Sequence, residues 1–358
     1  MTDAPQPFLD RRRLLGLLAG LSLAARVGEA RAMRSAIAGP IFQDAAAILV
    51  AGPEGGMLDR WGRVLAPALA QSLPPETPLR RLTVGAPDGV TGANQFGARV
   101  APDGQTVLLA PGDAAIAWLV GDPRAQYDVA RWVSVMVAVA PAVVVARPGS
   151  VVPGRPLRLA SAGPAGPDLP AVLGLDLLGV GLDLLPPLAD DALQAAIGQG
   201  GVDAAFLRGH RVPDQARALA AAGARPVFTL GALDPQGRVM RCPAFPDVPT
   251  LAELYPTIRG QTLAGPLYAG WCAAAVASQL EFALVLPQLT PASMVALWRR
   301  AGDDAAGSLD IQALATANGL RALGGGEATA TAGAAAADQP ALLALRSWLS
   351  QRYNWKPA

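Results

Sequence analysis

The sequence holds few side chains whose type and spacing favour catalysis. His210 is the only histidine, and it lies close to Arg208 and Arg211. Its imidazole could serve as a general base, but a solvated loop histidine is the favoured interpretation. Asp190 and Asp191 place two carboxylates at the start of a predicted helix, where acids ordinarily stabilise the helix N-terminus. Motifs for a nucleophile elbow (Gly-x-Ser-x-Gly) and for a phosphate loop are absent, so the sequence favours a binding protein over an enzyme.

Metal and disulfide chemistry are equally weakly supported. Cys242 and Cys272 cannot bind zinc alone, and His210 stands at no metal-ligand spacing from them. The two thiols could form a disulfide in an oxidising compartment. Two separate cysteines remain the favoured interpretation, because the sequence does not place their Cα atoms within bridging distance. We therefore expect no metal site and no cofactor.

Two glycine-rich loops are better candidates for a functional site. Residues 52–56 and 161–166 each follow a predicted strand and lead into a predicted helix. In open α/β sheets ligands bind beyond the carboxyl ends of the strands, and loop N–H groups at a helix N-terminus can hold an anion. The alternative is that the glycines only form tight turns, and the residues alone leave both interpretations open.

The elements that must position these loops alternate between short apolar runs and helical stretches. The predicted strands are 46–50, 79–84, 106–110, 133–139 and 142–146, then 157–160, 182–185, 204–206 and 226–230. Helices are predicted at 169–178, 191–198, 213–222 and 341–353, and the Gly- and Ala-rich residues 324–337 are predicted to form a loose loop. This alternation predicts parallel-type sheets covered by helices. The break at Arg147, Pro148 and Gly149 divides the pattern into two α/β lobes.

The charge balance and the N-terminal segment limit the possible partners and the expected location of the protein. The chain has 29 Lys and Arg against 28 Asp and Glu, which excludes nucleic acid as a partner because phosphate binding needs a concentrated basic field. Residues 1–32 are predicted to be a signal peptide, since three arginines precede an apolar run at 14–25 and Ala30-Arg31-Ala32 forms a cleavage site. The arginines resemble a twin-arginine (Tat) signal, and a Sec signal stays open. We expect a periplasmic protein.

Several motifs, taken in order, resemble one family. The segments are 53–59 (PEGGMLD), 89–94 (GVTGAN), 101–110 (APDGQTVLLA), Tyr127-Asp128 followed by Trp132, and 246–253 (PDVPTLAE). They are similar to Bug-type receptors, the substrate-binding components of tripartite tricarboxylate transporters. Each motif is weak alone, but five in the same order are specific.

The resemblance implies a two-lobed periplasmic-binding-protein (Venus-flytrap) fold with an interlobe cleft. Lobe 1 would comprise 33–147 and 260–358, and lobe 2 would comprise 148–259. Such a receptor captures a small organic acid, works as a monomer, and delivers its ligand to a membrane permease of the same transporter type. The expected ligand-binding residues are Pro53, Glu54, Gly55, Gly56, Thr91, Asn94, Asp113, Ser161, Gly163 and Arg208.

The sequence also departs from the family pattern. Glu54 occupies a position that is usually neutral, and its carboxylate would repel an anionic ligand. The loop at 161–166 has fewer polar donors than usual, and residues 271–279 look like an insertion. These changes make Arg208 the nearest candidate to pair with a carboxylate. Two other functions stay open, an α/β enzyme that uses the cleft and a divergent sensory ligand-binding protein.

Overall fold

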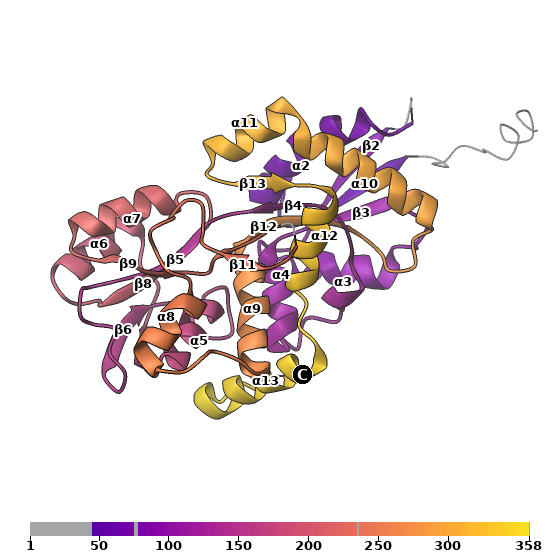
Figure 1. Cartoon of the computed structure of the whole chain (residues 1–358). Helices are drawn as coiled ribbons and strands as arrows, with labels where there is room; N and C mark the ends of the chain where they lie inside the picture. The colour runs from indigo at the N-terminus through magenta and orange to yellow at the C-terminus, as the bar shows by residue number, and fades with distance from the viewer. Residues whose placement is uncertain (1–44, 75–77, 235, 358) are drawn as a thin grey trace, which may run out of the picture. The chain divides into compact units, whose positions relative to one another are not determined.

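The computed structural model describes residues 45–74, 78–234 and 236–357, so the predicted signal peptide at 1–32 lies outside the described residues. Within 45–358 the strands form two main sheets, which define the two lobes (Figure 1). None of the helices in the described ranges is long and apolar enough to cross a membrane.

The first lobe is built on a six-stranded sheet. Its strands, in spatial order, are β13 (Arg321–Leu323), β4 (Val133–Val139), β12 (Leu280–Leu286), β3 (Thr106–Ala110), β1 (Ala46–Ala51) and β2 (Leu79–Val84). β1 pairs in parallel with β2 and β3. β12 runs antiparallel to β3 and β4, and β13 is antiparallel to β4. The predicted parallel arrangement therefore holds for the first three strands, and the strands that join the lobes make the sheet mixed.

The second lobe repeats this design on five strands. In spatial order they are β7 (Gly181–Leu185), β6 (Pro156–Ala160), β8 (Ala204–Arg208), β5 (Ala142–Ala146) and β9 (Arg225–Thr229). β6 is parallel to β7 and β8, whereas β5 is antiparallel to β8 and β9. A short hairpin follows, made of β10 (Ala232–Leu233) and β11 (Val239–Met240).

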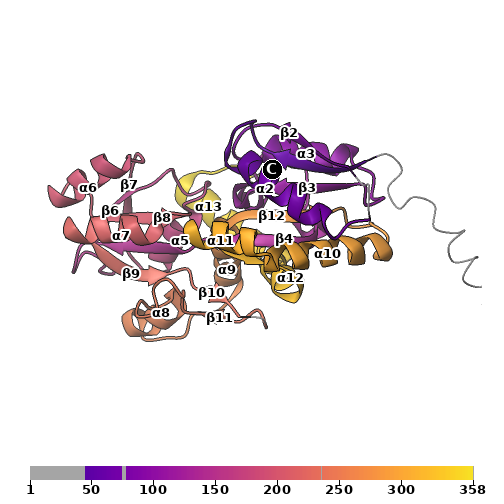
Figure 2. The ribbon, with the colours of Figure 1, turned by 90° about the horizontal axis from the view of Figure 1, so that it is seen from above.

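Helices surround both sheets, as Figures 1 and 2 show. In the first lobe they are α2 (Met57–Ala70), α3 (Val90–Arg99), α4 (Gly112–Val120), α10 (Ala292–Gly307), α11 (Leu309–Ala317) and α12 (Gly325–Ala334), with the 3-10 turn η1 (Val129–Arg131). In the second lobe they are α5 (Leu169–Leu177), α6 (Asp190–Gly198), α7 (Val212–Ala221) and α8 (Leu251–Arg259). α9 (Pro266–Gln279) and α13 (Gln339–Tyr353) contact elements of both lobes.

The chain passes from the first sheet to the second between Val139 and Ala142. The boundary predicted after Arg147 therefore falls beyond β5, which belongs to the second sheet. The Pro/Gly break had suggested a linker, but it only ends β5. Ala140 and Pro141 are the residues that connect the two sheets at this first crossover.

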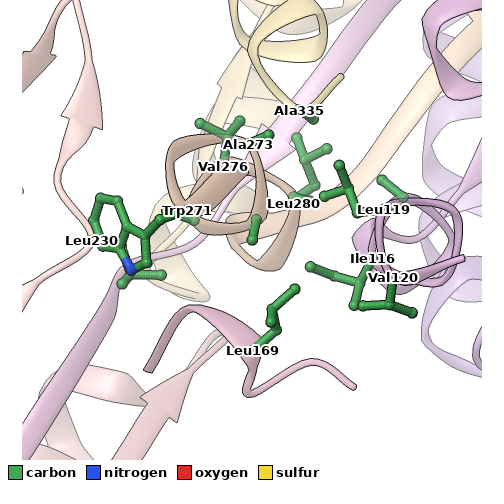
Figure 3. Packing of buried hydrophobic residues seen from close by; sticks show 14 of the residues in the cluster. Ile116, Leu119, Val120, Leu169, Leu230, Trp271, Ala273, Val276, Leu280 and Ala335 are labelled. Atoms are coloured by element: carbon green, nitrogen blue, oxygen red, sulfur yellow. The ribbon is translucent and has the colours of Figure 1, made fainter. Parts of the chain in front are cut away.

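A continuous apolar core joins the lobes through α9. Trp271 on this helix is 1% exposed, and its indole N–H donates to the carbonyl of Pro170, at the start of α5, at 2.8 Å. Its neighbours Ala273 and Val276 belong to the same buried cluster as Ile116 of α4 (Figure 3). Residues 271–279, which look like an insertion in the sequence, thus form the apolar connection between the lobes.

The Gly- and Ala-rich segment 324–337 corrects another expectation. It was predicted to be a loose loop, but most of it forms α12, which packs on β4. Alanine has the highest helix propensity, and Ala328 is completely buried in this contact. The two cysteines are free, as the favoured interpretation held, and burial raises the thiol pKa of both Cys242 and Cys272.

Candidate ligand-binding site

A cavity of about 190 Å³ lies where the two lobes meet. Its lining residues are Gly52, Pro53, Gly56, Met57, Leu58, Pro87, Pro111, Asp113, Arg208, Leu280 and Glu281. All of them except Arg208 come from the first lobe, so the cavity is a hollow in that lobe that a single arginine of the second lobe closes. Its volume equals that of roughly six liquid waters at about 30 Å³ each, which suits a small solute.

Arg208 reaches across the cleft to Asp113. Its two terminal nitrogens donate to the two carboxylate oxygens, Nη1 to Oδ1 at 3.0 Å and Nη2 to Oδ2 at 3.2 Å. Both side chains are partly buried, with 32% of Arg208 and 26% of Asp113 exposed. This is the bidentate geometry with which arginine recognises carboxylates. The sequence named both residues as ligand contacts, and the structure pairs them with each other.

The position of Asp113 depends on a close backbone approach. Asp113 lies in the first turn of α4, directly after Gly112. A Cβ atom at Gly112 would lie 2.0 Å from the carbonyl oxygen of Ala277 and 2.7 Å from that of Leu280. Only glycine allows α4 to start this close to the end of α9, and this contact holds Asp113 at the cavity.

Glu281 is a cavity residue that sequence reasoning missed. It is the second residue of β12, and its burial raises the pKa of the carboxyl group. The positive charges of His210 and Arg208 and a hydrogen bond with Trp61 act in the opposite direction. Glu281 also lines a neighbouring cavity of about 250 Å³, together with His210 and Trp61. The only available signal was a glutamate within an otherwise apolar run.

The first glycine loop uses one of its own N–H groups internally. Gly55 has a φ of 72°, a left-handed conformation that favours glycine. Its N–H donates to the carboxylate of Asp59 at 3.0 Å. This bond, together with Arg63 and Arg81, lowers the pKa of the buried Asp59. Met57 and Leu58, in the first turn of α2, line the cavity, and first-turn N–H groups have no acceptor within a helix.

The loop of the second lobe is also closed on itself. The N–H of Gly163 donates to Ser161 Oγ at 3.0 Å, and the N–H of Ala162 donates to Asp168 at 2.7 Å. Burial raises the pKa of Asp168, and its hydrogen bonds with the Ala162 N–H and with the Ser161 side chain oppose that shift. Ser161 and Gly163 are therefore engaged within their own loop and lie outside the lining of the interlobe cavity.

The remaining predicted residues also lie apart from the cavity. Asn94 binds the backbone of 124–126, donating to the Arg124 carbonyl at 2.7 Å and accepting from the Gln126 N–H at 2.8 Å. Thr91 and Glu54 are exposed and do not line the cavity. Of the ten predicted residues, the cavity brings together Pro53, Gly56, Asp113 and Arg208.

The surface offers other hollows as well. A larger cavity of about 520 Å³ lies in the first lobe beside Tyr127 and Trp132, whose rings stack at 5.7 Å. Among the described residues, no group of three or more His, Cys, Asp or Glu side chains could hold a metal ion. What sets the interlobe cavity apart is the direct ion pair in its wall, between Asp113 of the first lobe and Arg208 of the second.

Comparison with known proteins supports the fold. Neither a family model nor a curated protein matches the sequence. Among solved structures, a TctC solute-binding protein from Polaromonas, solved without ligand, matches with a TM-score of 0.64 and 16% identity over 86% of this chain and 99% of that chain. The periplasmic binding protein BugD has a TM-score of 0.49, 17% identity and coverages of 86% and 97%. MatC from Rhodopseudomonas palustris with bound malate has a TM-score of 0.47, 18% identity and coverages of 86% and 97%. The chain therefore has the fold of a TctC-type solute-binding protein, and the predicted resemblance is confirmed at the level of fold.

Proposed function

We propose that this chain is an extracytoplasmic receptor that binds a small organic acid in the interlobe cavity and delivers it to a membrane permease of the tripartite tricarboxylate type. The observation that carries the proposal is the bidentate contact of Arg208 with Asp113 across the lobes. The carboxylate of Asp113 already pairs with Arg208 at the point where the lobes meet. A ligand carboxylate of the same geometry can replace it.

The mechanism is capture without chemistry. The ligand enters the hollow of the first lobe, and its carboxylate takes the place of Asp113 on Arg208. The first turn of α2, whose Met57 and Leu58 line the cavity, supplies further N–H donors for the ligand. Because Arg208 belongs to the second lobe, binding holds the lobes together. A permease would then recognise the closed receptor.

Calorimetric titration of the purified chain against a panel of small mono- and dicarboxylic acids tests this proposal. Arg208→Ala should weaken the binding of the tightest-binding acid by roughly 1.5–3 kcal/mol, the usual contribution of hydrogen bonds to a charged group. Arg80→Ala is the matched control, because Arg80 is exposed on β2 and does not line the cavity. Equal affinity of the wild type and Arg208→Ala for every acid would refute the proposed site.

Export is a separate part of the proposal. The arginines and the apolar run within residues 1–32 support it. The mature protein from a periplasmic fraction should begin near Met33 when its N-terminus is sequenced. Protein retained in the cytoplasm with Met1 intact would contradict export.

A further inference from the structure

The interlobe cavity is more acidic than a site for simple organic anions needs to be. Its walls carry two carboxyl groups, Asp113 and Glu281, and one cation, Arg208. If a ligand carboxylate takes Arg208, Asp113 loses its partner and stays in the same small hollow as Glu281. A dicarboxylate would add two further negative charges, and like charges this close disfavour each other strongly.

We propose that the ligand of this cavity is an amino acid, whose carboxylate binds Arg208 and whose ammonium group binds between Asp113 and Glu281. The inference rests on the proposed receptor function and names its ligand class. The ammonium group compensates Asp113 at the moment when that side chain gives up Arg208. Each charge in the filled cavity then has a partner of opposite sign.

The placement of the groups supports this assignment. Arg208 enters from the second lobe, whereas Asp113 and Glu281 belong to α4 and β12 of the first lobe. An ammonium group has three N–H donors, and two carboxylates offer enough acceptors for them. Among the described residues Glu281 forms no ion pair with an arginine or lysine, unlike Asp59 and Asp203. The charges of His210 and Arg208 act on it without a direct ion pair, and a cationic ligand group would add one.

The remaining residues of the cavity wall limit the size of the ligand and the kind of side chain that it can carry. Met57, Leu58 and Leu280 give the cavity an apolar surface beside its charged groups. With a volume of about 190 Å³, the hollow suits an amino acid with a small side chain better than a long dicarboxylate. Small apolar side chains are therefore the expected ones, and a short acidic side chain is the comparison, because its second carboxylate would have no cationic partner in the cavity.

Matched pairs of ligands test the inference, because their members differ only in the amino group. The probes are L-alanine against propionate and L-aspartate against succinate, titrated by calorimetry into the purified full chain. We expect the amino member of at least one pair to bind about tenfold tighter or more, the effect of one hydrogen bond to a charged group. Glu281→Gln should abolish that preference while leaving the affinity for the plain acid unchanged or higher. Asp113→Asn is a second variant with the same expected direction, and Asp183→Asn on the exposed part of β7 is the control.

The outcomes separate the two proposals. If plain acids bind as tightly as amino acids and Arg208→Ala weakens the binding of both, the receptor proposal stands and the amino-acid inference is wrong. The inference is also wrong if Glu281→Gln and Asp113→Asn, folded as judged by circular dichroism, keep the full amino-acid preference. If neither member of any pair binds, the amino-acid inference fails, and the acid panel with Arg208→Ala decides the receptor proposal on its own.

Discussion

The backbone N–H of Ala140 donates to the carbonyl of Gln279 at 2.8 Å. Ala140 connects β4 to β5, and Gln279 ends α9 just before β12. The bond therefore joins the two segments that connect the lobes, and it places both crossovers side by side. A rotation of one lobe against the other would have to bend the chain at both crossovers, and it would also have to disturb the contacts of α9 and α13 with the second lobe.

The Arg208–Asp113 pair should hold the cleft shut when no ligand is present. Asp113→Ala removes an interlobe contact worth about 1 kcal/mol for a partly exposed pair, which changes the ratio of open to closed molecules about fivefold. Small-angle scattering without ligand should therefore show a larger radius of gyration for this variant than for the wild type. Asp183→Ala is the control. An unchanged scattering profile would mean that other contacts, such as those of α9, set the interlobe distance.

Trp271 should stabilise both lobes at once. It is 1% exposed and bonds to Pro170, and the same buried cluster extends into both lobes. Trp271→Ala should lower the free energy of unfolding by about 3–5 kcal/mol, and the wild type should unfold in a single transition seen identically by fluorescence and circular dichroism. Leu343→Ala, at a position that is 57% exposed, should change stability by about 0.5 kcal/mol or less. Two separated transitions in the wild type would contradict a shared core.

Local patterns predicted most of the fold. The strands β3, β4 and β5 have the bounds expected from their apolar runs, because buried strands of this kind are short and continuous in hydrophobicity. β2 also has the expected bounds, although its sequence, LRRLTV, is mixed and its middle is exposed. α12 was missed because its glycines outweighed its alanines in the local pattern, and only packing on β4 decides the outcome. The crossover was placed too late for a similar reason: Pro148 and Gly149 mark a turn, but strand pairing decides which sheet β5 joins.

The site was predicted only in part. Asp113 and Arg208 were named because each follows a strand near a loop, and both line the cavity. Their direct pairing spans 95 positions, which no local pattern reveals. Glu281 was missed because β12 reaches the first sheet only after the second crossover, so its neighbours Trp61 and His210 come from distant segments. Asn94 was named because its side chain is polar, but its amide forms hydrogen bonds with the backbone of residues 124–126.

Asp59 should make stability depend on acidic pH. The Gly55 N–H, Arg63 and Arg81 lower its pKa in the folded state. A depressed carboxylate pKa stabilises the fold above the unfolded-state pKa, and this contribution is lost as the pH falls through the folded-state pKa. Asp59→Asn should cost about 1.5–3 kcal/mol at pH 7, and the difference should shrink below about pH 4. Urea titrations at several pH values measure this. A difference that stays constant with pH would assign the effect to packing.

Glu281 should make the affinity for amino acids depend on pH. Its pKa is raised, whereas that of Asp59 is lowered. Burial raises its pKa above 4.5 in the free protein, opposed by His210, by a hydrogen bond with Trp61 and by Arg208, while the charge of Asp113 raises it further. Only the ionised carboxylate accepts hydrogen bonds from an ammonium group on both oxygens. Affinity for the best-binding amino acid should therefore rise as the pH increases through this raised pKa, whereas the affinity for its plain-acid partner should fall or stay level.

Calorimetry from about pH 4.5 to 7.5 measures this dependence. His210→Gln removes the imidazole charge, so a rise that persists in this variant belongs to Glu281. Glu281→Gln should give a flat profile of affinity against pH for the amino acid over the same range.

The raised pKa of Glu281 also affects stability, because it makes the ionised form unfavourable in the folded state. The stabilising effect of protonated Glu281 is full below its unfolded-state pKa and is lost as the pH rises through the folded-state pKa. Glu281→Gln should consequently be at least as stable as the wild type at pH 7 in urea titrations. A less stable variant whose amino-acid affinity keeps the wild-type pH profile would show that Glu281 has a structural role and does not bind the ammonium group.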